Sequence, residues 1–174
     1  MSPRAHGPPI VTSPDDGSTV MIRLPTEVGP SACMADRPLP GTVRQPEPKQ
    51  ADLRQLHTDM LASFPECRLW FNDGTNADGK VVANPNIGYG DYTITYADGS
   101  SREFYRIGLS ANTTGISVYV LGLDDKTYLA RTYGASIGKA SVTGYCTKFK
   151  RLAVINADAL QAAIRHGMTV GRTG

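Results

Sequence analysis

Two segments of the chain place apolar residues three or four positions apart, the spacing of one helix face. The first segment spans residues 49–64 and stops before Pro65; its apolar residues are Leu53, Leu56, Met60, Leu61 and Phe64. The second follows Asn156, a residue type that commonly caps helices, and ends at Gly167; its apolar residues are Leu160, Ala163 and Ile164. The pattern predicts an amphipathic helix at each end of a folded region.

Between these helices, apolar and polar residues alternate with the period of a β-strand. Residues 88–109 contain two such runs around Asp98-Gly99, a dipeptide typical of tight turns, and predict a hairpin. Further strands are expected at residues 116–120 and 145–152, and a short helix is expected between Asp124 or Asp125 and Gly134. We therefore predict an α+β fold, in which an antiparallel β-sheet of about five strands carries the N- and C-terminal helices and one short inserted helix.

Residues 1–48 differ in composition from the rest of the chain. They hold ten of the 12 prolines and show no apolar period, so this segment has little apolar surface to offset the entropy of ordering its backbone. We predict a disordered Pro-rich tail at 1–48, a folded domain at 49–168 and a frayed C-terminus at 169–174. Met34, inside the tail, offers an alternative start of translation.

The composition narrows the function classes. A net charge of +2 is far from the clustered basicity of nucleic-acid-binding proteins, and no apolar stretch approaches the roughly 20 residues that span a bilayer. The three cysteines, Cys33, Cys67 and Cys146, show neither disulfide-framework nor zinc spacing, which favours a reducing compartment. These features predict a cytoplasmic protein that binds neither nucleic acid nor membrane, and they leave the oligomeric state open.

Few residues carry recognisable chemistry. The string from Gly134 to Ser141 resembles a phosphate-binding P-loop, but its spacing is one residue short, so Lys139 is either an anion-binding residue of a flexible loop or a solvated lysine. Cys146 opens a predicted strand on which Lys148 and Lys150 share its face, and a nearby ammonium group would favour the reactive thiolate over an inert thiol. His57 falls on the apolar face of the first helix, which favours a packed, hydrogen-bonded histidine over a ligand.

Several further segments have a structural interpretation. Residues 72–79, NDGTNADG, suggest a calcium loop, but they do not fit the EF-hand ligand pattern and are predicted to form turns. Residues 135–144 are rich in small side chains and are predicted to form a loop. Five of the eight tyrosines lie in or beside the predicted sheet, where they either pack or line a cleft or partner surface: Tyr89, Tyr92, Tyr96, Tyr105 and Tyr119.

The order of these motifs resembles the YdhG-like family, catalogued as domain of unknown function 1801. The matching pieces between residues 52 and 167 are Gly88-Tyr89-Gly90 with Tyr92, Gly108-Leu109-Ser110, the strand 116–120, Gly138-Lys139, Cys146 and Lys150-Arg151-Leu152. The resemblance implies a compact intracellular α+β domain, and some relatives are described as frataxin-like iron chaperones. Close relatives carry Ser-Pro-Arg-Lys where this chain has Ser110-Ala-Asn-Thr, so two positive charges are missing here.

Together, the residues and the resemblance favour a small, non-enzymatic ligand-binding or iron-chaperone-like module whose partner is a small ligand or a metal ion. The resemblance places its site at Ser110, Lys139 and Cys146, with no catalytic residue, cofactor or metal ligand assigned. One alternative is a cysteine-dependent enzyme or redox protein that uses Cys146. Another is a protein-interaction module with a tyrosine-rich sheet face.

Overall fold

The computed structural model describes residues 10–12, 19–21, 46–76 and 78–170. Met34 and most of the predicted tail therefore lie outside the described residues, as do the last four residues of the chain. Within the predicted tail, two short strands pair antiparallel, β1 (Ile10–Thr12) and β2 (Thr19–Met21). Both strands are rich in β-branched residues, which favour extended backbone.

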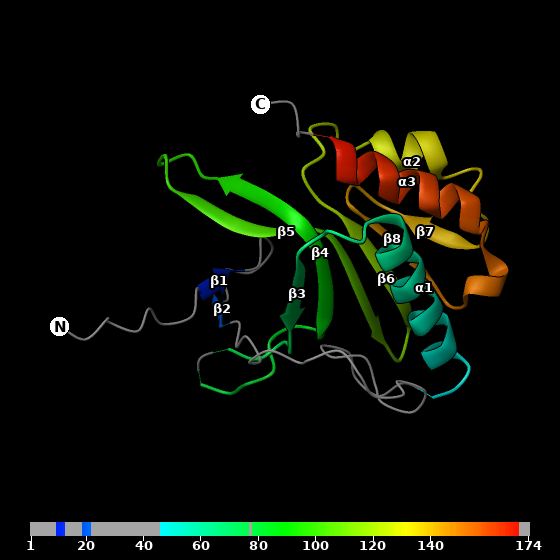
Figure 1. Cartoon of the computed structure of the whole chain (residues 1–174), viewed down its shortest axis with the longest axis horizontal. Coiled ribbons are helices and arrows are strands. Elements are labelled where there is room, and N and C mark those ends of the chain that lie inside the picture. Colours follow the sequence, from blue (N-terminus) through cyan, green and yellow to red (C-terminus); the bar gives the residue numbers. More distant parts are fainter. Residues whose placement is uncertain (1–9, 13–18, 22–45, 77, 171–174) are drawn as a thin grey trace.

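Six strands form one antiparallel sheet in the order β3-β4-β5-β6-β8-β7 (Figure 1). The strands are β3 (Leu69–Asn72), β4 (Asn86–Thr95), β5 (Ser101–Asn112), β6 (Gly115–Val120), β7 (Ala140–Val142) and β8 (Cys146–Phe149). The predicted α+β class is confirmed. The edge strand β3 was not predicted individually, and the loop predicted at residues 135–144 is wrong where β7 forms. Four and three residues are too few for an alternating pattern to stand out.

The hairpin predicted around Asp98-Gly99 is confirmed as β4 and β5. The Gly99 amide donates to the carbonyl oxygen of Tyr96 at 3.0 Å, and Asp98 Oδ1 accepts from the Ser100 amide at 2.9 Å. Gly99 has φ +80°, a left-handed conformation that glycine adopts without steric cost. In Figure 1 the turn end of this hairpin extends beyond the part of the sheet that the helices cover.

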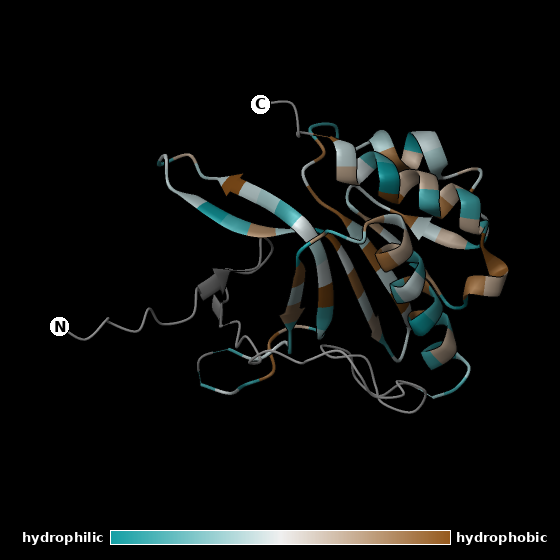
Figure 2. Ribbon diagram, viewed as in Figure 1, coloured by the Kyte–Doolittle hydropathy of each residue, from teal (hydrophilic) through white to brown (hydrophobic). Residues whose placement is uncertain are grey.

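The helices pack on one face of the sheet (Figure 1). They are α1 (Lys49–Ser63), α2 (Tyr128–Tyr133) and α3 (Ala157–Thr169), with a 3-10 turn, η1 (Leu152–Val154), between β8 and α3. Figure 2 shows many apolar positions on the strands beneath them. Leu53 from α1, Ile164 from α3 and Ile116 from β6 are at most 1% exposed in the shared core. No described helix combines the length and apolarity needed to cross a bilayer.

The start of α3 matches the prediction, and its end does not. The Asn156 side chain accepts from the amides of Asp158 and Ala159 at 3.0 and 3.2 Å, as a helix cap does. The helix then continues through Gly167 to Thr169. A Cβ at Gly167 would lie 2.3 Å from Cγ1 of Val120, so glycine serves close packing of α3 against β6 here and does not end the helix.

The second face of the sheet is covered in part by aromatic side chains. Gly88 and Gly108 are directly paired on β4 and β5. A Cβ on either would lie 2.4 or 2.7 Å from atoms of Tyr105, whose ring therefore occupies the space above both glycines. Tyr105 packs there with Trp70 and Phe104 in a small cluster separate from the main core. The glycines of the sequence motifs thus make room for an aromatic ring.

Candidate functional site

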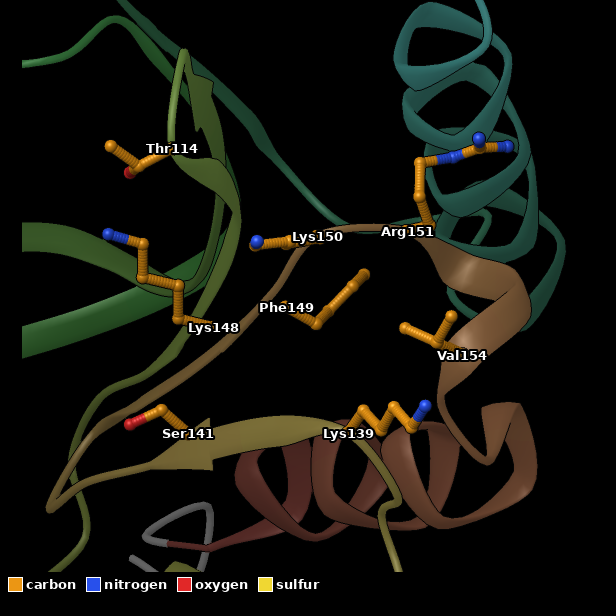
Figure 3. Close-up of a pocket in the computed structure, with 8 residues that line it drawn as sticks. All are labelled: Thr114, Lys139, Ser141, Lys148, Phe149, Lys150, Arg151 and Val154. Carbon is orange, nitrogen blue, oxygen red and sulfur yellow. The ribbon is translucent and has the colours of Figure 1, made fainter.

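A hollow of about 580 Å³ lies beside the end of β8, where β7, η1 and the turn between β5 and β6 also contribute residues. Figure 3 shows its lining residues, with Phe149 at their centre. They are Thr114, Lys139, Ser141, Lys148, Phe149, Lys150, Arg151 and Val154. Four of the eight are basic, and none of these described residues is acidic. The hollow therefore has a positive wall.

Strand register brings part of this wall together from distant positions in the chain. Ser110 of β5 pairs with Ser117 of β6, Ser117 pairs with Lys148 of β8, and Lys148 pairs with Ser141 of β7. Directly paired residues project from the same face of a sheet, so these four form one polar row. Their neighbours Val118 and Thr147 face the helices, which places the polar row on the opposite face.

Three lysines supply the uncompensated charge of the hollow. Lys139, Lys148 and Lys150 are exposed, and none of them forms a salt bridge with a carboxylate of the described residues. Arg151 differs, because its Nε donates to Asp52 Oδ2 at 2.6 Å and this ion pair is locally neutral. The three ammonium groups are therefore the groups available to an incoming ligand.

Helix α1 holds two sides of the hollow in place. Asp52 accepts the Arg151 hydrogen bond and also one from the Leu152 amide at 3.0 Å, which fixes the chain as it leaves β8. One turn earlier, Lys49 Nζ donates to the carbonyl oxygens of Asn112 and Thr113 at 2.7 and 3.2 Å, in the turn that carries Thr114. The first turn of α1 thus connects two lining segments that are nearly 40 residues apart in the chain.

The three residues predicted as a site do not line one cavity. Lys139 lines the hollow. Ser110 lies inside β5, 2% exposed, and donates to the carbonyl oxygen of Pro85 at 2.7 Å. Cys146 lies half-buried at the start of β8, opposite Tyr119, and is not among the lining residues. Ser110 and Cys146 share the sheet face of the hollow without reaching it.

The surroundings of Cys146 do not favour a thiolate. Burial raises the pKa of the Cys146 thiol, and the hydrogen bond with Ser117 and the charge of Lys148 offset this only in part. Burial likewise raises the pKa of Cys67. The charge of Lys148 does lower the pKa of the Cys146 thiol, as predicted, but desolvation of the thiol raises this pKa by more.

His57 is a packed, hydrogen-bonded histidine, as predicted. Its Nδ1 lies 2.7 Å from the hydroxyl of Tyr89, and burial lowers the pKa of His57. Burial also raises the pKa of Tyr89 far above its ordinary value, so the hydroxyl stays protonated and can donate to the neutral imidazole. The pair joins α1 to β4 inside the fold and is separate from the hollow.

The tyrosines divide between packing and exposure. Tyr89 and Tyr105 are buried, whereas Tyr96 at the hairpin tip is 40% exposed. Tyr119 and Tyr145 stack with their ring centroids 6.3 Å apart, and Tyr145 is 38% exposed.

Among the described residues, no three His, Cys, Asp or Glu side chains gather in a group that could hold a metal ion.

Lys148 and Lys150 were predicted as neighbours of Cys146 on one strand, and Thr114, Arg151 and Val154 were not assigned to a site. A local signal was present, since residues 148–151 read Lys-Phe-Lys-Arg, three basic residues in four. Comparisons of the chain with protein-family models, curated proteins and solved structures find no match.

Proposed function

We propose that this domain is a non-enzymatic module that binds a small anion in the hollow beside β8. The observation that carries the proposal is the charge arrangement, in which Lys139, Lys148 and Lys150 border one hollow without a carboxylate partner among the described residues. Exposed lysines on an ordinary surface are interspersed with acidic residues. Here the nearest described ion pair, Arg151 with Asp52, leaves the three ammonium charges uncompensated.

The expected affinity follows from the exposure of these groups. Two unit charges about 4 Å apart in water attract by roughly 1 kcal/mol. Three ammonium groups at that distance from one phosphate would thus contribute at most about 3 kcal/mol, which corresponds to a Kd no tighter than about 6 mM. Inorganic phosphate alone should therefore bind weakly, and added salt should weaken it further because it screens exposed charges.

The charge of the hollow favours an anion over iron as the small ligand. Iron in proteins is held by carboxylate, imidazole or thiolate groups, and the hollow presents ammonium groups and hydroxyls instead. The Asp52 carboxylate, which contacts the lining residue Arg151, already accepts two hydrogen bonds. The iron-chaperone-like version of the function, membership of the YdhG-like family and a cytoplasmic location stay predictions.

Isothermal titration of the full chain with inorganic phosphate at low ionic strength tests the proposal. We expect millimolar binding that weakens at least tenfold in the double variant Lys148→Gln with Lys150→Gln, because two of three attractive charges are removed. Lys80→Gln is the matched control, since it removes an exposed lysine that does not line the hollow. Phosphate binding that is absent, or that falls equally in the control, would contradict the proposal.

A further inference from the structure

The hollow offers more than charge. Most of its accessible surface is contributed by carbon atoms, although half of its lining residues are basic. Lysine side chains place their methylene groups along a wall and their ammonium groups at its rim. Val154 adds a branched apolar side chain that is 40% exposed, in contrast to the buried core residues around it. The lining therefore combines carbon surface with four basic side chains.

The volume of the hollow also exceeds what a single inorganic anion fills. At about 580 Å³ it lies within the range of roughly 300–1,000 Å³ that is typical of sites for small organic molecules. A bare phosphate would contact the ammonium groups and leave the carbon surface in contact with water. Burial of that surface requires an organic group attached to the anion.

We propose that the ligand is a small phosphomonoester whose organic group has an apolar face. This inference rests on the proposed anion-binding function and names its ligand class. A phosphomonoester is close to doubly charged at neutral pH, which suits three ammonium groups better than a singly charged carboxylate does. The phosphate contacts ammonium groups that border the hollow, from Lys139, Lys148 and Lys150, and the organic group lies against Val154 and the lysine methylene groups.

Phenyl phosphate is the probe that tests this inference, with inorganic phosphate and glycerol 3-phosphate as comparisons in the same titration of the full chain. Burial of about 55 Å² of carbon surface corresponds to a tenfold gain in affinity. We therefore expect phenyl phosphate to bind about tenfold more tightly than inorganic phosphate, and glycerol 3-phosphate to resemble inorganic phosphate.

Two valine variants test which side chain contributes the gain in affinity for phenyl phosphate. Val154→Ser should remove most of the preference for phenyl phosphate over inorganic phosphate, and the readout is the ratio of the two affinities in the same variant. Val81→Ser is the matched control, since Val81 is 71% exposed and does not line the hollow. A preference that persists in Val154→Ser, or that falls equally in Val81→Ser, would place the organic group elsewhere and overturn the inference.

The outcomes separate this inference from the function on which it rests. If inorganic phosphate binds and phenyl phosphate binds no more tightly, the ligand class is wrong and the anion site stands. If neither binds, both fail. If the protein sediments with vesicles that contain phosphatidic acid, and phenyl phosphate releases it, the site recognises a lipid headgroup and the assignment to a free small molecule is overturned.

Discussion

Replacement of Gly167 by alanine sets two opposing effects against each other inside α3. In an exposed helix interior, glycine to alanine raises stability by about 1 kcal/mol, because alanine loses less backbone entropy on folding. At Gly167 the new Cβ would lie 2.3 Å from Cγ1 of Val120 and 3.0 Å from Cδ1 of Ile107. Carbon atoms in favourable contact are about 3.5–4.0 Å apart. Both neighbours are 1% exposed, so neither side chain can move into solvent.

The steric overlap should therefore cost more free energy than the higher helix propensity of alanine contributes. Overpacking of a well-filled core costs about 1–3 kcal/mol, and the overlap with Val120 places Gly167→Ala near the upper end of that range. After the gain in helix propensity is subtracted, we expect a net loss of about 2 kcal/mol in the free energy of unfolding. Urea unfolding followed by the fluorescence of Trp70, the one tryptophan of the chain, measures this loss.

Two further variants make the test of Gly167 specific. Ala162 is exposed on the same helix, so Ala162→Gly should cost about 1 kcal/mol and calibrate the propensity effect. Val120→Ala removes the atom that the new Cβ would meet, so its cost and that of Gly167→Ala should combine to less than their sum. A Gly167→Ala protein as stable as the wild type, or additive costs in the double variant, would refute the packing argument.

Three more predictions follow from single groups. Asp52→Ala should lower the free energy of unfolding by about 1–2 kcal/mol in urea unfolding, because the partly exposed Arg151 loses its partner. Asp59→Ala, at a half-buried position of the same helix where the carboxylate accepts one exposed hydrogen bond from Gln55 at 2.8 Å, should change it by less than about 0.5 kcal/mol. Burial lowers the pKa of His57, so the free energy of unfolding should fall as the pH drops below about 6.5. This fall should be smaller in His57→Gln. Equal pH profiles of the free energy of unfolding for the two proteins would contradict the effect of burial on His57. Because burial raises the pKa of Cys146, peptide mapping after iodoacetamide treatment at pH 7 should show slower alkylation than that of a free cysteine; a rate equal to or above the free value would restore the cysteine-enzyme alternative.

The fold was largely predictable, because its main elements carry strong local patterns. The apolar period of α1, the alternation around Asp98-Gly99 and the Asn156 cap each specify an element within about 20 residues of chain. The edge strands β3 and β7 carry no such pattern, and their extended backbone comes from pairing with a longer neighbour. The role of Gly167 was likewise not predictable from the local sequence, because it depends on packing against Val120, 47 residues away in the chain.

The site was predictable only in part, because long-range register assembles it. Lys139 was selected from a glycine-flanked loop, and the three basic residues at 148–151 are visible in the sequence. No local pattern, however, brings Ser141 opposite Lys148 or places Val154 beside Lys139. Ser110 was assigned to the site through the resemblance, but it lies inside β5 and its hydroxyl donates to the carbonyl oxygen of Pro85.

The central claim is that a small anion binds among Lys139, Lys148 and Lys150. Its most direct test is a two-dimensional NMR titration of the isotope-labelled full chain with phenyl phosphate. We predict saturable shifts of the backbone amide signals of residues 139–141 and 148–151, and signals of the Tyr96 hairpin tip that do not move. Shifts that are absent at 139–141 and 148–151, or that centre on Cys146 and Tyr119 instead, would contradict the account.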